Sequence, residues 1–209
     1  MRLKNVKNAK EIVEEGLYYV ANPYENKGKW SKVFNNNNDI YIEIGMGKGN
    51  FIIESAINNP NINYIGIEKM TSVIVRAIQK SNSLKLDNLK LVRLDALELE
   101  NIFSNEVSKI YLNFSDPWPK ERHSKRRLTS NIFLNMYDNI FKSDKVIEMK
   151  TDNIDLFNYS VDSLKNQGYD IIYLTNDLHK ESIDNVMTEY ESNFVSKGVK
   201  INKLIAKKK

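Results

Sequence analysis

The sequence predicts an α/β fold with a mostly parallel sheet that is covered by helices on both faces. Short β-branched or aromatic runs alternate with segments whose apolar residues recur at helical spacing, as in a series of βαβ units. Parallel strands need crossover connections, and crossover helices cover the faces of the sheet. The chain has 209 residues, of which 41% are hydrophobic, enough for one sizeable core. We therefore predict a single domain over residues 1–209.

Seven runs of residues are predicted as strands. They cover residues 39–45, 63–68, 89–95, 109–115, 145–152, 169–175 and 199–206. A helix is predicted over residues 154–166, and the two strands after it are separated only by a polar segment. Because such a pair can be joined locally, the last strand is predicted to run antiparallel to the others. Residues 1–38 are predicted to form a partly ordered N-terminal extension with a helix over Glu11 to Val20.

Composition excludes several classes of site. The chain has 0 Cys, which excludes disulfides, thiolate metal sites and a cysteine nucleophile, and its 2 His stand far apart, so no metal is expected. No apolar run is long enough to span a membrane and the N-terminus lacks the apolar core of a secretory signal, which predicts a cytoplasmic protein. The net charge of +4 is concentrated in residues 120–127 and the C-terminal lysines. That clustering favours a polyanionic partner.

A glycine-rich turn follows the first predicted strand. In open α/β sheets, ligands bind outside the carboxyl ends of the strands. The stretch "EIGMGKGNF" places Gly45, Gly47 and Gly49 there, where glycine lets a ligand approach the main chain before a helix begins. The spacing differs from the Gly-x-Gly-x-x-Gly fingerprint of dinucleotide sites. A tight turn without a ligand is the alternative interpretation.

Acidic residues lie on successive predicted strands. Glu68 ends the second strand about 20 residues after the glycine turn, where an acid accepts hydrogen bonds from ribose hydroxyls. Asp95 ends the third, where its side chain would accept from an adenine amine, and Glu43 lies in the first. These acids would repel a pyrophosphate and attract a cationic nucleoside, a description that S-adenosylmethionine fits. Each acid alone would be an ordinary solvated residue.

The fourth predicted strand leads into "LNFSDPWPKERHSKRR", residues 112–127. Proline after Asp116 fixes the backbone, so the carboxylate stands at the strand tip. Trp118 is placed to stack on a base, and the basic run after it to hold the flanking phosphates. The alternative is a core tryptophan beside a solvated charged face. Asp152 follows the fifth strand, and "TEYESNF" at 188–194 would by itself be an N-capped helical turn.

These motifs together resemble those of a known family. The segments "EIGMGKG", "GIEK", "LDA", "FSDPWPKERHSKRR", "KTDN" and "TEYESNFVSKG", in this order and spacing, are similar to those of the bacterial tRNA (guanine-N7-)-methyltransferases, over about residues 39–205. The resemblance implies a Rossmann-like class I methyltransferase fold and S-adenosylmethionine as methyl donor. It implies N7 of a guanosine in the tRNA variable loop as the acceptor. No obligate protein partner is expected, and the chain is predicted to be a monomer or a homodimer.

The resemblance also assigns residues, motif by motif. The residues it implies for donor binding are Glu43, Gly45, Gly47, Gly49, Glu68, Asp95, Ala96 and Asp116. Asp116 is also assigned to catalysis. The residues it implies for contact with the substrate are Lys120, Asp152, Thr188, Glu189, Tyr190 and Glu191, and those for contact with the RNA are Arg122, His123, Ser124, Lys125, Arg126 and Arg127.

Two other functions remain open at this point. A methyltransferase acting on an exocyclic amine also places an acid or amide before proline after the fourth strand, but typically with a second proline and an aromatic residue where this chain has Trp-Pro. Analysis of the methylated product separates the two. A non-catalytic RNA-binding module would explain the basic loop but not the acids around the glycine turn, and it would not bind the donor.

Overall fold

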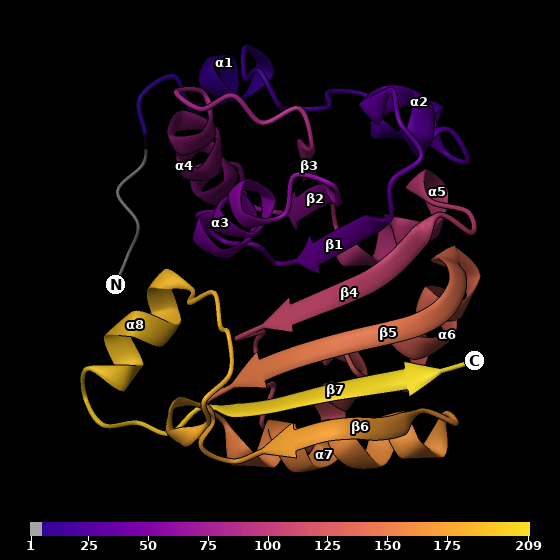
Figure 1. Ribbon diagram of the computed structural model, residues 1–209, viewed down its shortest axis with the longest axis vertical. Coiled ribbons are helices and arrows are strands. Elements are labelled where there is room, and N and C mark those ends of the chain that lie inside the picture. Colours follow the sequence, from indigo (N-terminus) through magenta and orange to yellow (C-terminus); the bar gives the residue numbers. More distant parts are fainter. Residues whose placement is uncertain (1–5) are drawn as a thin grey trace.

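The structure, a computed structural model, describes residues 6–209. Its seven-stranded sheet has the order β3-β2-β1-β4-β5-β7-β6, and β7 alone runs antiparallel to its two neighbours (Figure 1). This confirms the predicted fold, including the reversed last strand. The strands are β1 (Ile40–Ile44), β2 (Asn63–Glu68), β3 (Leu89–Arg93), β4 (Val107–Asn113), β5 (Phe141–Thr151), β6 (Asp170–Thr175) and β7 (Asn202–Lys208).

Helices connect and cover these strands. The α-helices are α1 (Ala9–Glu14), α2 (Trp30–Phe34), α3 (Asn50–Asn58), α4 (Thr71–Ser81), α5 (Leu99–Ile102), α6 (Asn131–Ile140), α7 (Ile154–Asn166) and α8 (Glu189–Val195). Short 3-10 turns are η1 (Pro23–Asn26), η2 (Ala96–Glu98), η3 (Glu121–Arg126) and η4 (Leu178–Lys180). None of the helices within residues 6–209 combines the length and apolar character needed to cross a bilayer.

The alternation of side chains along the strands divides the core into two layers. Ile42 of β1 belongs to a cluster formed with residues of α2, α5, α6 and α7. Tyr64 of β2 points the other way, into a cluster formed with residues of α1, α3 and α4. Successive residues of a strand face opposite sides of the sheet, so both faces of these strands are buried and their sequences are almost wholly apolar. Residues at the strand ends are not required for the core and can therefore bind ligands.

The N-terminal segment differs from the prediction of a helix over Glu11 to Val20. The helix ends at Glu14, and the chain then runs beside the edge strand β3, where the Val20 amide donates to the Leu91 carbonyl at 2.9 Å. The Leu91 amide in turn donates to the Tyr18 carbonyl at 2.8 Å. Residues 18–20 therefore pair with the open edge of the sheet and do not continue the helix that their apolar spacing predicted. Residues 1–5 of the predicted extension lie outside the described residues.

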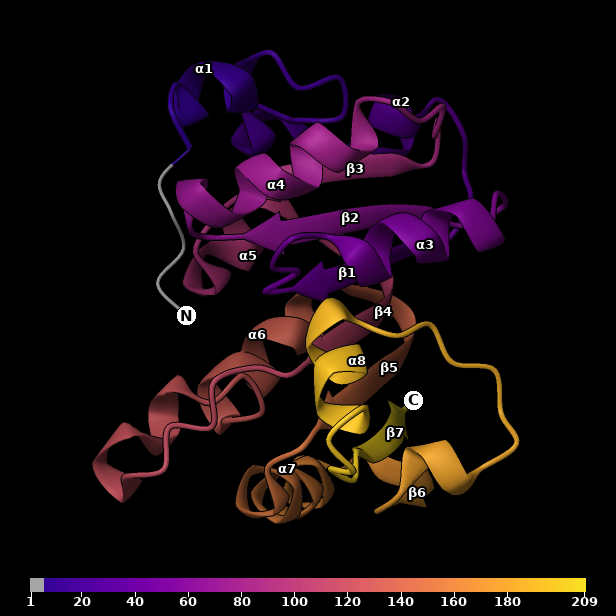
Figure 2. The same cartoon turned by 90° about the vertical axis from the view of Figure 1, so that its left-hand side faces the viewer.

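The carboxyl ends of β1, β4, β5 and β6 point to one side of the molecule, and α8 stands at that side (Figure 1). Figure 2 looks at the molecule from there, with α8 in the foreground. β4 ends at Asn113, two residues earlier than predicted, so Phe114 and Ser115 already belong to the loop that leaves the sheet. The loops at this edge carry the residues predicted for the site.

Candidate active site

The glycine turn between β1 and α3 has a backbone that favours glycine. Gly45, Gly47 and Gly49 have φ angles of +76°, +59° and +78°, in the left-handed region where other residues are strained. At Gly49 an added Cβ would also lie 2.7 Å from Cβ of Ala77 in α4. The repeated glycines are thus required by local geometry, and they leave amide groups at the edge of the sheet.

Glu68, the last residue of β2, is bonded to this turn. Its Oε2 accepts from the Gly47 amide at 3.1 Å, and its Oε1 accepts from the Met70 amide at 2.9 Å. Burial raises the pKa of the Glu68 carboxyl, the backbone amides lower it in part, and the charge of Asp116 raises it again. Each oxygen keeps a lone pair for a further donor such as a hydroxyl. The carboxylates of Glu68 and Asp116 therefore face the same space.

Asp95 follows β3 and caps the turn η2. Its Oδ1 accepts from the Leu97 amide at 3.1 Å, and its Oδ2 pairs with the Lys69 ammonium at 2.5 Å. The hydrogen bond from Lys69 is the main reason why the pKa of Asp95 is lowered. The Lys69 side chain is 65% exposed, and exposed ion pairs contribute little. The ammonium is therefore easily displaced by a ligand that approaches Asp95.

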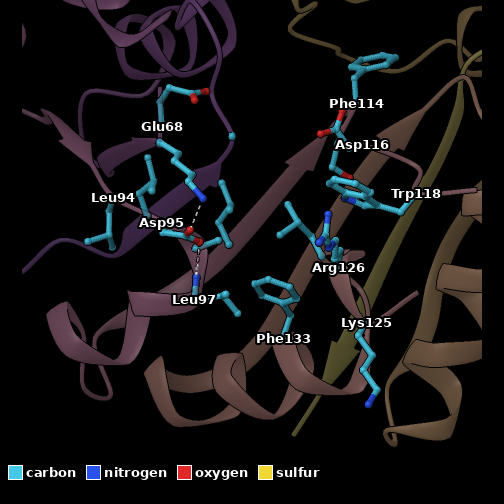
Figure 3. Close-up of a pocket in the computed structure, with 17 residues that line it drawn as sticks. Glu68, Leu94, Asp95, Leu97, Phe114, Asp116, Trp118, Lys125, Arg126 and Phe133 are labelled. Carbon is cyan, nitrogen blue, oxygen red and sulfur yellow. Dashed lines mark hydrogen bonds and ion pairs between the residues drawn. The ribbon is translucent and has the colours of Figure 1, made fainter. Parts of the chain in front are cut away.

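These acids line one cavity of about 640 Å³ (Figure 3). Glu68, Leu94 and Asp95 lie on one side of it, and Phe114, Asp116 and Trp118 on the other. The predicted site residues that line this cavity are Gly45, Glu68, Asp95, Ala96, Asp116, Lys125 and Arg126. The ends of β1 to β4 and the loops after them thus bring together five residues predicted for the donor, and η3 adds two predicted for RNA.

A second cavity of about 310 Å³ lies between the glycine turn and α8. The predicted site residues that line it are Glu43, Gly45, Gly47, Thr188, Glu189 and Tyr190. The Lys48 ammonium of the glycine turn pairs with Glu189 of α8 at 2.8 Å and joins the two walls. Phe114 lines both cavities. Phe114 therefore contributes to the wall of both spaces.

Glu43 is buried beside the second cavity without a cation in contact. Its Oε1 accepts from Asn113 Nδ2 at 2.9 Å, whereas its Oε2 and the Asn113 Oδ1 have no hydrogen-bond partner among residues 6–209. Burial raises the pKa of Glu43 to about 7. Unpaired buried acceptors are costly, and they mark a place where a ligand can supply the missing donor.

The loop after β4 is held in an unusual conformation. Phe114 and Trp118 have φ angles of +52° and +43°, which is strained for aromatic residues. Arg127 holds the loop from below: its Nε donates to the Pro117 carbonyl at 3.2 Å and its Nη2 to the Trp118 carbonyl at 3.1 Å. Arg127 is only 8% exposed, and its guanidinium lies 4.2 Å from the ring centroid of Tyr159. In this structure Arg127 therefore supports the loop from within, and its contact with RNA stays a prediction.

The remaining cations of the loop are at the surface. Arg122, Lys125 and Arg126 are exposed, and His123 and Ser124 are half-buried. The Arg126 guanidinium lies 4.8 Å from the ring centroid of Trp118 and covers it. In Figure 3 Lys125 extends away from the cavity, while Trp118 and Arg126 lie against it. Polyanion contacts are thus open to Arg122, Lys125 and Arg126.

The segment at 188–194 begins a helix, as its capping pattern indicates. The Thr188 hydroxyl accepts from the Glu191 amide at 2.9 Å, and Glu191 Oε2 accepts weakly from the Thr188 amide at 3.4 Å, which is a capping box. Glu191 is fully buried against Lys150, so its side chain faces the interior of the protein, and its contact with substrate stays a prediction. Tyr190 is 45% exposed, stacks on Phe194 and contacts Phe114.

Besides Glu191, two further predicted substrate residues lie outside the walls of both cavities. Lys120 is exposed at the start of η3, and Asp152 is half-buried directly after β5. The charge of Asp152 contributes to a raised pKa of Tyr190, after burial of that ring. Asp152 therefore lies near the second cavity, whereas Lys120 lies on the basic loop.

Three residues of the site were missed. Asn113 donates a hydrogen bond to the buried Glu43 carboxyl. Phe114 lines both cavities, and Lys150 is fully buried against Glu191 of α8. Lys150 offered a signal, because a lysine within an apolar strand needs a buried partner. Asn113 and Phe114 offered none, since their types are common at strand ends.

Comparison with known proteins places the chain in a family. A family model described as "Putative methyltransferase" matches residues 37–204. A tRNA (guanine-N(7)-)-methyltransferase of Lachnoclostridium phytofermentans is 51% identical over 99% of this chain and 98% of that protein. One of Geobacillus sp. (strain WCH70) is 48% identical over 96% of this chain and 93% of that protein.

Solved structures agree with this fold. The 16S rRNA methyltransferase KamB covers 86% of this chain and 92% of its own with a TM-score of 0.66 and 12% identity. An antibiotic-related methyltransferase covers 87% and 92% with a TM-score of 0.64 and 19% identity. At these identities the likeness concerns the fold, which is that of class I methyltransferases. From its close relatives and its matched motifs together, this chain belongs to the family of tRNA (guanine-N7-)-methyltransferases.

Proposed function

We propose that this chain transfers a methyl group from S-adenosylmethionine to N7 of a guanosine in the variable loop of tRNA. The observation that carries the proposal is the meeting of the strand-end acids Glu68, Asp95 and Asp116 in one cavity, beside a loop of exposed cations. Acids in the cavity favour a cationic nucleoside, and cations outside it favour a polyanion. The close relatives named above support the same assignment.

The residues of the two cavities fit the donor. Glu68 retains lone pairs that can accept hydrogen bonds from ribose hydroxyls. Asp95 can exchange its exposed ion pair with Lys69 for a hydrogen bond from the adenine amine. In the second cavity Glu43 and Asn113 present unpartnered oxygens, which suit an ammonium group. No cluster of His, Cys, Asp or Glu suited to a metal occurs in the described part of the chain.

When bound, S-adenosylmethionine supplies an electrophilic methyl group on its sulfonium. Guanine N7 carries an in-plane lone pair and no proton, so the protein needs no general base. Asp116 faces the cavity opposite Glu68, where its charge stabilises the purine as positive charge develops on it. Phe114 lies between the cavities and positions the two reactants by contact. Alignment and electrostatics are therefore the protein's contributions to the rate.

The RNA is proposed to bind along the loop from Lys120 to Arg126 and to present its base to the cavity. Arg122, Lys125 and Arg126 supply exposed charges for the phosphates, and Trp118 lies between this surface and the cavity. We further propose that residues 1–209 act as one methyltransferase domain, to whose core Trp30 and Phe34 of the N-terminal segment contribute.

The proposed function is tested by incubating the protein with methyl-labelled S-adenosylmethionine and bulk tRNA. Digestion to nucleosides and chromatography should yield label in N7-methylguanosine. Label in an N6- or N4-methylated nucleoside would instead support action on an exocyclic amine. Absence of both labelling and donor binding in calorimetry would support a non-catalytic RNA-binding module.

Glu68→Ala should weaken S-adenosylmethionine binding and leave tRNA affinity nearly unchanged. The substitution removes a charged acceptor of hydrogen bonds, which costs about 1.5 to 3 kcal/mol, or roughly 10- to 150-fold in Kd. Calorimetry measures the donor affinity, and Glu54→Ala, an exposed acid on the outer side of α3, is the matched control. Unchanged donor affinity in a folded Glu68→Ala variant would exclude this residue from the donor site.

Glu43→Gln should stabilise the ligand-free protein above pH 7 and weaken donor binding. The pKa of Glu43 is raised by folding to about 7, so the folded state keeps a proton that the unfolded state loses near 4.5. The stability that this proton contributes is present at low pH and is lost as the pH rises from about 4.5 to 7. At pH 8 the expected gain for glutamine is on the order of 3 kcal/mol.

Urea unfolding of wild type and Glu43→Gln between pH 4.5 and 8 measures this gain. The difference in the free energy of unfolding should grow with pH up to about 7 and then stay constant, because Glu43 is then ionised in both states. A constant difference at every pH would show that Glu43 does not titrate in this range and would contradict its assigned environment.

A further inference from the structure

Two opposite charges are fully buried behind the second cavity. Lys150 of β5 and Glu191 of α8 each have side chains with 0% exposure, and Lys150 Nζ lies 2.6 Å from Glu191 Oε2. The ammonium also donates to the Val186 carbonyl at 2.8 Å and to Asn185 Oδ1 at 3.1 Å. All three partners lie in the segment that leads into α8 or in α8 itself, so one ammonium ties this segment to the sheet.

The carboxylate completes the connection from the other side. Glu191 Oε1 accepts from Asn185 Nδ2 at 2.7 Å and lies 2.9 Å from Nε2 of His179 in η4. Its backbone amide and its Oε2 form the capping box with Thr188. The segment from η4 to the start of α8 is thereby wrapped around a single carboxylate.

Lys150 is also joined to the remaining walls of the site. Its backbone carbonyl accepts from the Phe114 amide at 2.8 Å, and its ammonium lies 5.1 Å from the ring centroid of Phe51 in α3. On α8, the ring centroid of Tyr190 lies 5.0 Å from that of Phe114, and Glu189 reaches Lys48. The buried pair therefore connects β5 to α8, which stands beside the ends of the strands in Figure 2. The side chains of Glu189, Tyr190 and Asn193 on this helix line the second cavity.

Stability alone is a weak reason for such a pair. Removing two charges from water is expensive, and apolar residues of similar size often give equal or greater stability in their place. The charged pair instead fixes one arrangement of α8 against the sheet. A buried charge is stable only where all its hydrogen-bond and ion-pair partners are within bonding distance, so other arrangements are disfavoured. A second buried lysine on the neighbouring strand, Lys203, pairs with Glu148 and lines neither cavity.

We propose that the Lys150–Glu191 ion pair is a positioning unit that holds α8 over the second cavity, so that Tyr190 and Glu189 seat the acceptor base beside Phe114. The proposal rests on the proposed function for the identity of that base. The residues proposed to hold the donor are positioned without the pair: Glu68 and Asp95 by the backbone amides of Met70 and Leu97, and Glu43 of β1 by Asn113 of β4. Lys150 and Glu191 act through Tyr190 and Glu189 and do not themselves contact the substrate.

The test is the double variant Lys150→Met/Glu191→Gln, which removes both charges and keeps the capping box. It should unfold within a few degrees of wild type and bind S-adenosylmethionine within about twofold of wild-type Kd, but its kcat on tRNA should fall about tenfold or more. Hydrogen exchange should accelerate in residues 189–195 and stay unchanged in β1 to β4. Lys203→Met is the matched control: its stability changes, but its kcat and the exchange of α8 do not.

A double variant with wild-type kcat and wild-type exchange of α8 would overturn the proposal. So would a loss of donor binding accompanied by faster exchange throughout, since the pair would then support the fold in general. If the double variant does not fold, Lys150→Gln/Glu191→Gln, which also removes both charges but keeps polar side chains, gives the same readouts, and its wild-type turnover and exchange would likewise overturn the need for a charged pair. If wild type itself does not methylate tRNA, the proposed function fails while the exchange measurement still decides whether the pair holds α8.

Discussion

Asp116→Asn is expected to lower the rate of methyl transfer by about 100-fold or more while the protein folds normally and still binds donor and tRNA. Asparagine keeps the size of the side chain but removes the charge that faces Glu68 across the first cavity. Loss of one electrostatic interaction with the charge that develops in a transition state typically costs about 100- to 1,000-fold in kcat. Single-turnover kinetics with saturating donor and tRNA separates this step from binding.

The matched control for this variant is Ser115→Ala, which changes the neighbouring residue of the same cavity wall without removing a charge. Because N7 carries no proton, the wild-type rate should also show no steep requirement for a base that titrates near neutrality. Near-wild-type turnover by Asp116→Asn would exclude Asp116 from catalysis and leave it a structural residue of the loop after β4.

The second large effect is expected from removing the exposed cations of the basic loop. Replacing Arg122, Lys125 and Arg126 together by Ala should weaken tRNA binding by about two orders of magnitude at moderate salt, if each cation contributes about 1 kcal/mol. The plot of log Kd against log salt should become shallower by nearly one unit for each phosphate that is no longer neutralised. Donor affinity should be unchanged, because none of the three holds Glu68 or Asp95.

A matched triple variant removes equal charge elsewhere. Lys27, Lys29 and Lys32 are exposed at η1 and α2, at the opposite edge of the sheet from α8 (Figure 1). Their replacement by Ala should leave both the affinity and the salt slope close to wild type. Equal slopes for wild type and the loop variant would show that the basic loop is a solvated face. Arg127 is kept in both variants because it supports the loop from within.

The sequence was sufficient to predict the fold and the edge of the sheet that carries the site. Alternating and helical periodicities located β1 to β7, and parallel strands deliver their carboxyl ends to one edge. Glu68, Asp95 and Asp116 could therefore be placed together without knowledge of side-chain contacts. The glycine turn was predictable for the same reason, since its backbone conformation depends only on local residue types.

The sequence was not sufficient to separate exposed charges from buried ones. Arg127 continues the run Lys125-Arg126 without interruption, yet it turns inward to the carbonyls of Pro117 and Trp118. Glu191 stands between exposed neighbours in the sequence, yet it faces the buried Lys150. In both cases the direction of one side chain is decided by a partner far along the chain or by a strained loop, which residue type and spacing do not encode.

The end of β4 shows a third limit. The apolar run continues through Phe114, which predicted a strand to residue 115, but the strand ends at Asn113 and Phe114 adopts a positive φ. A strained aromatic residue between two cavities is stable only because surrounding groups hold it, including the Lys150 carbonyl and Tyr190. Tertiary contacts thus override the local preference at the place where the reactants are proposed to meet.

The most direct test of the central claim replaces the acceptor atom itself. Two synthetic tRNAs are compared that differ only in the variable-loop guanosine, one of them carrying 7-deazaguanosine, in which N7 is replaced by a carbon with hydrogen. With labelled S-adenosylmethionine, the unmodified tRNA should take up close to one methyl group and the 7-deaza tRNA none, although both should bind with similar affinity. Undiminished labelling of the 7-deaza tRNA would show that the methyl group goes to another atom and would contradict the proposed function.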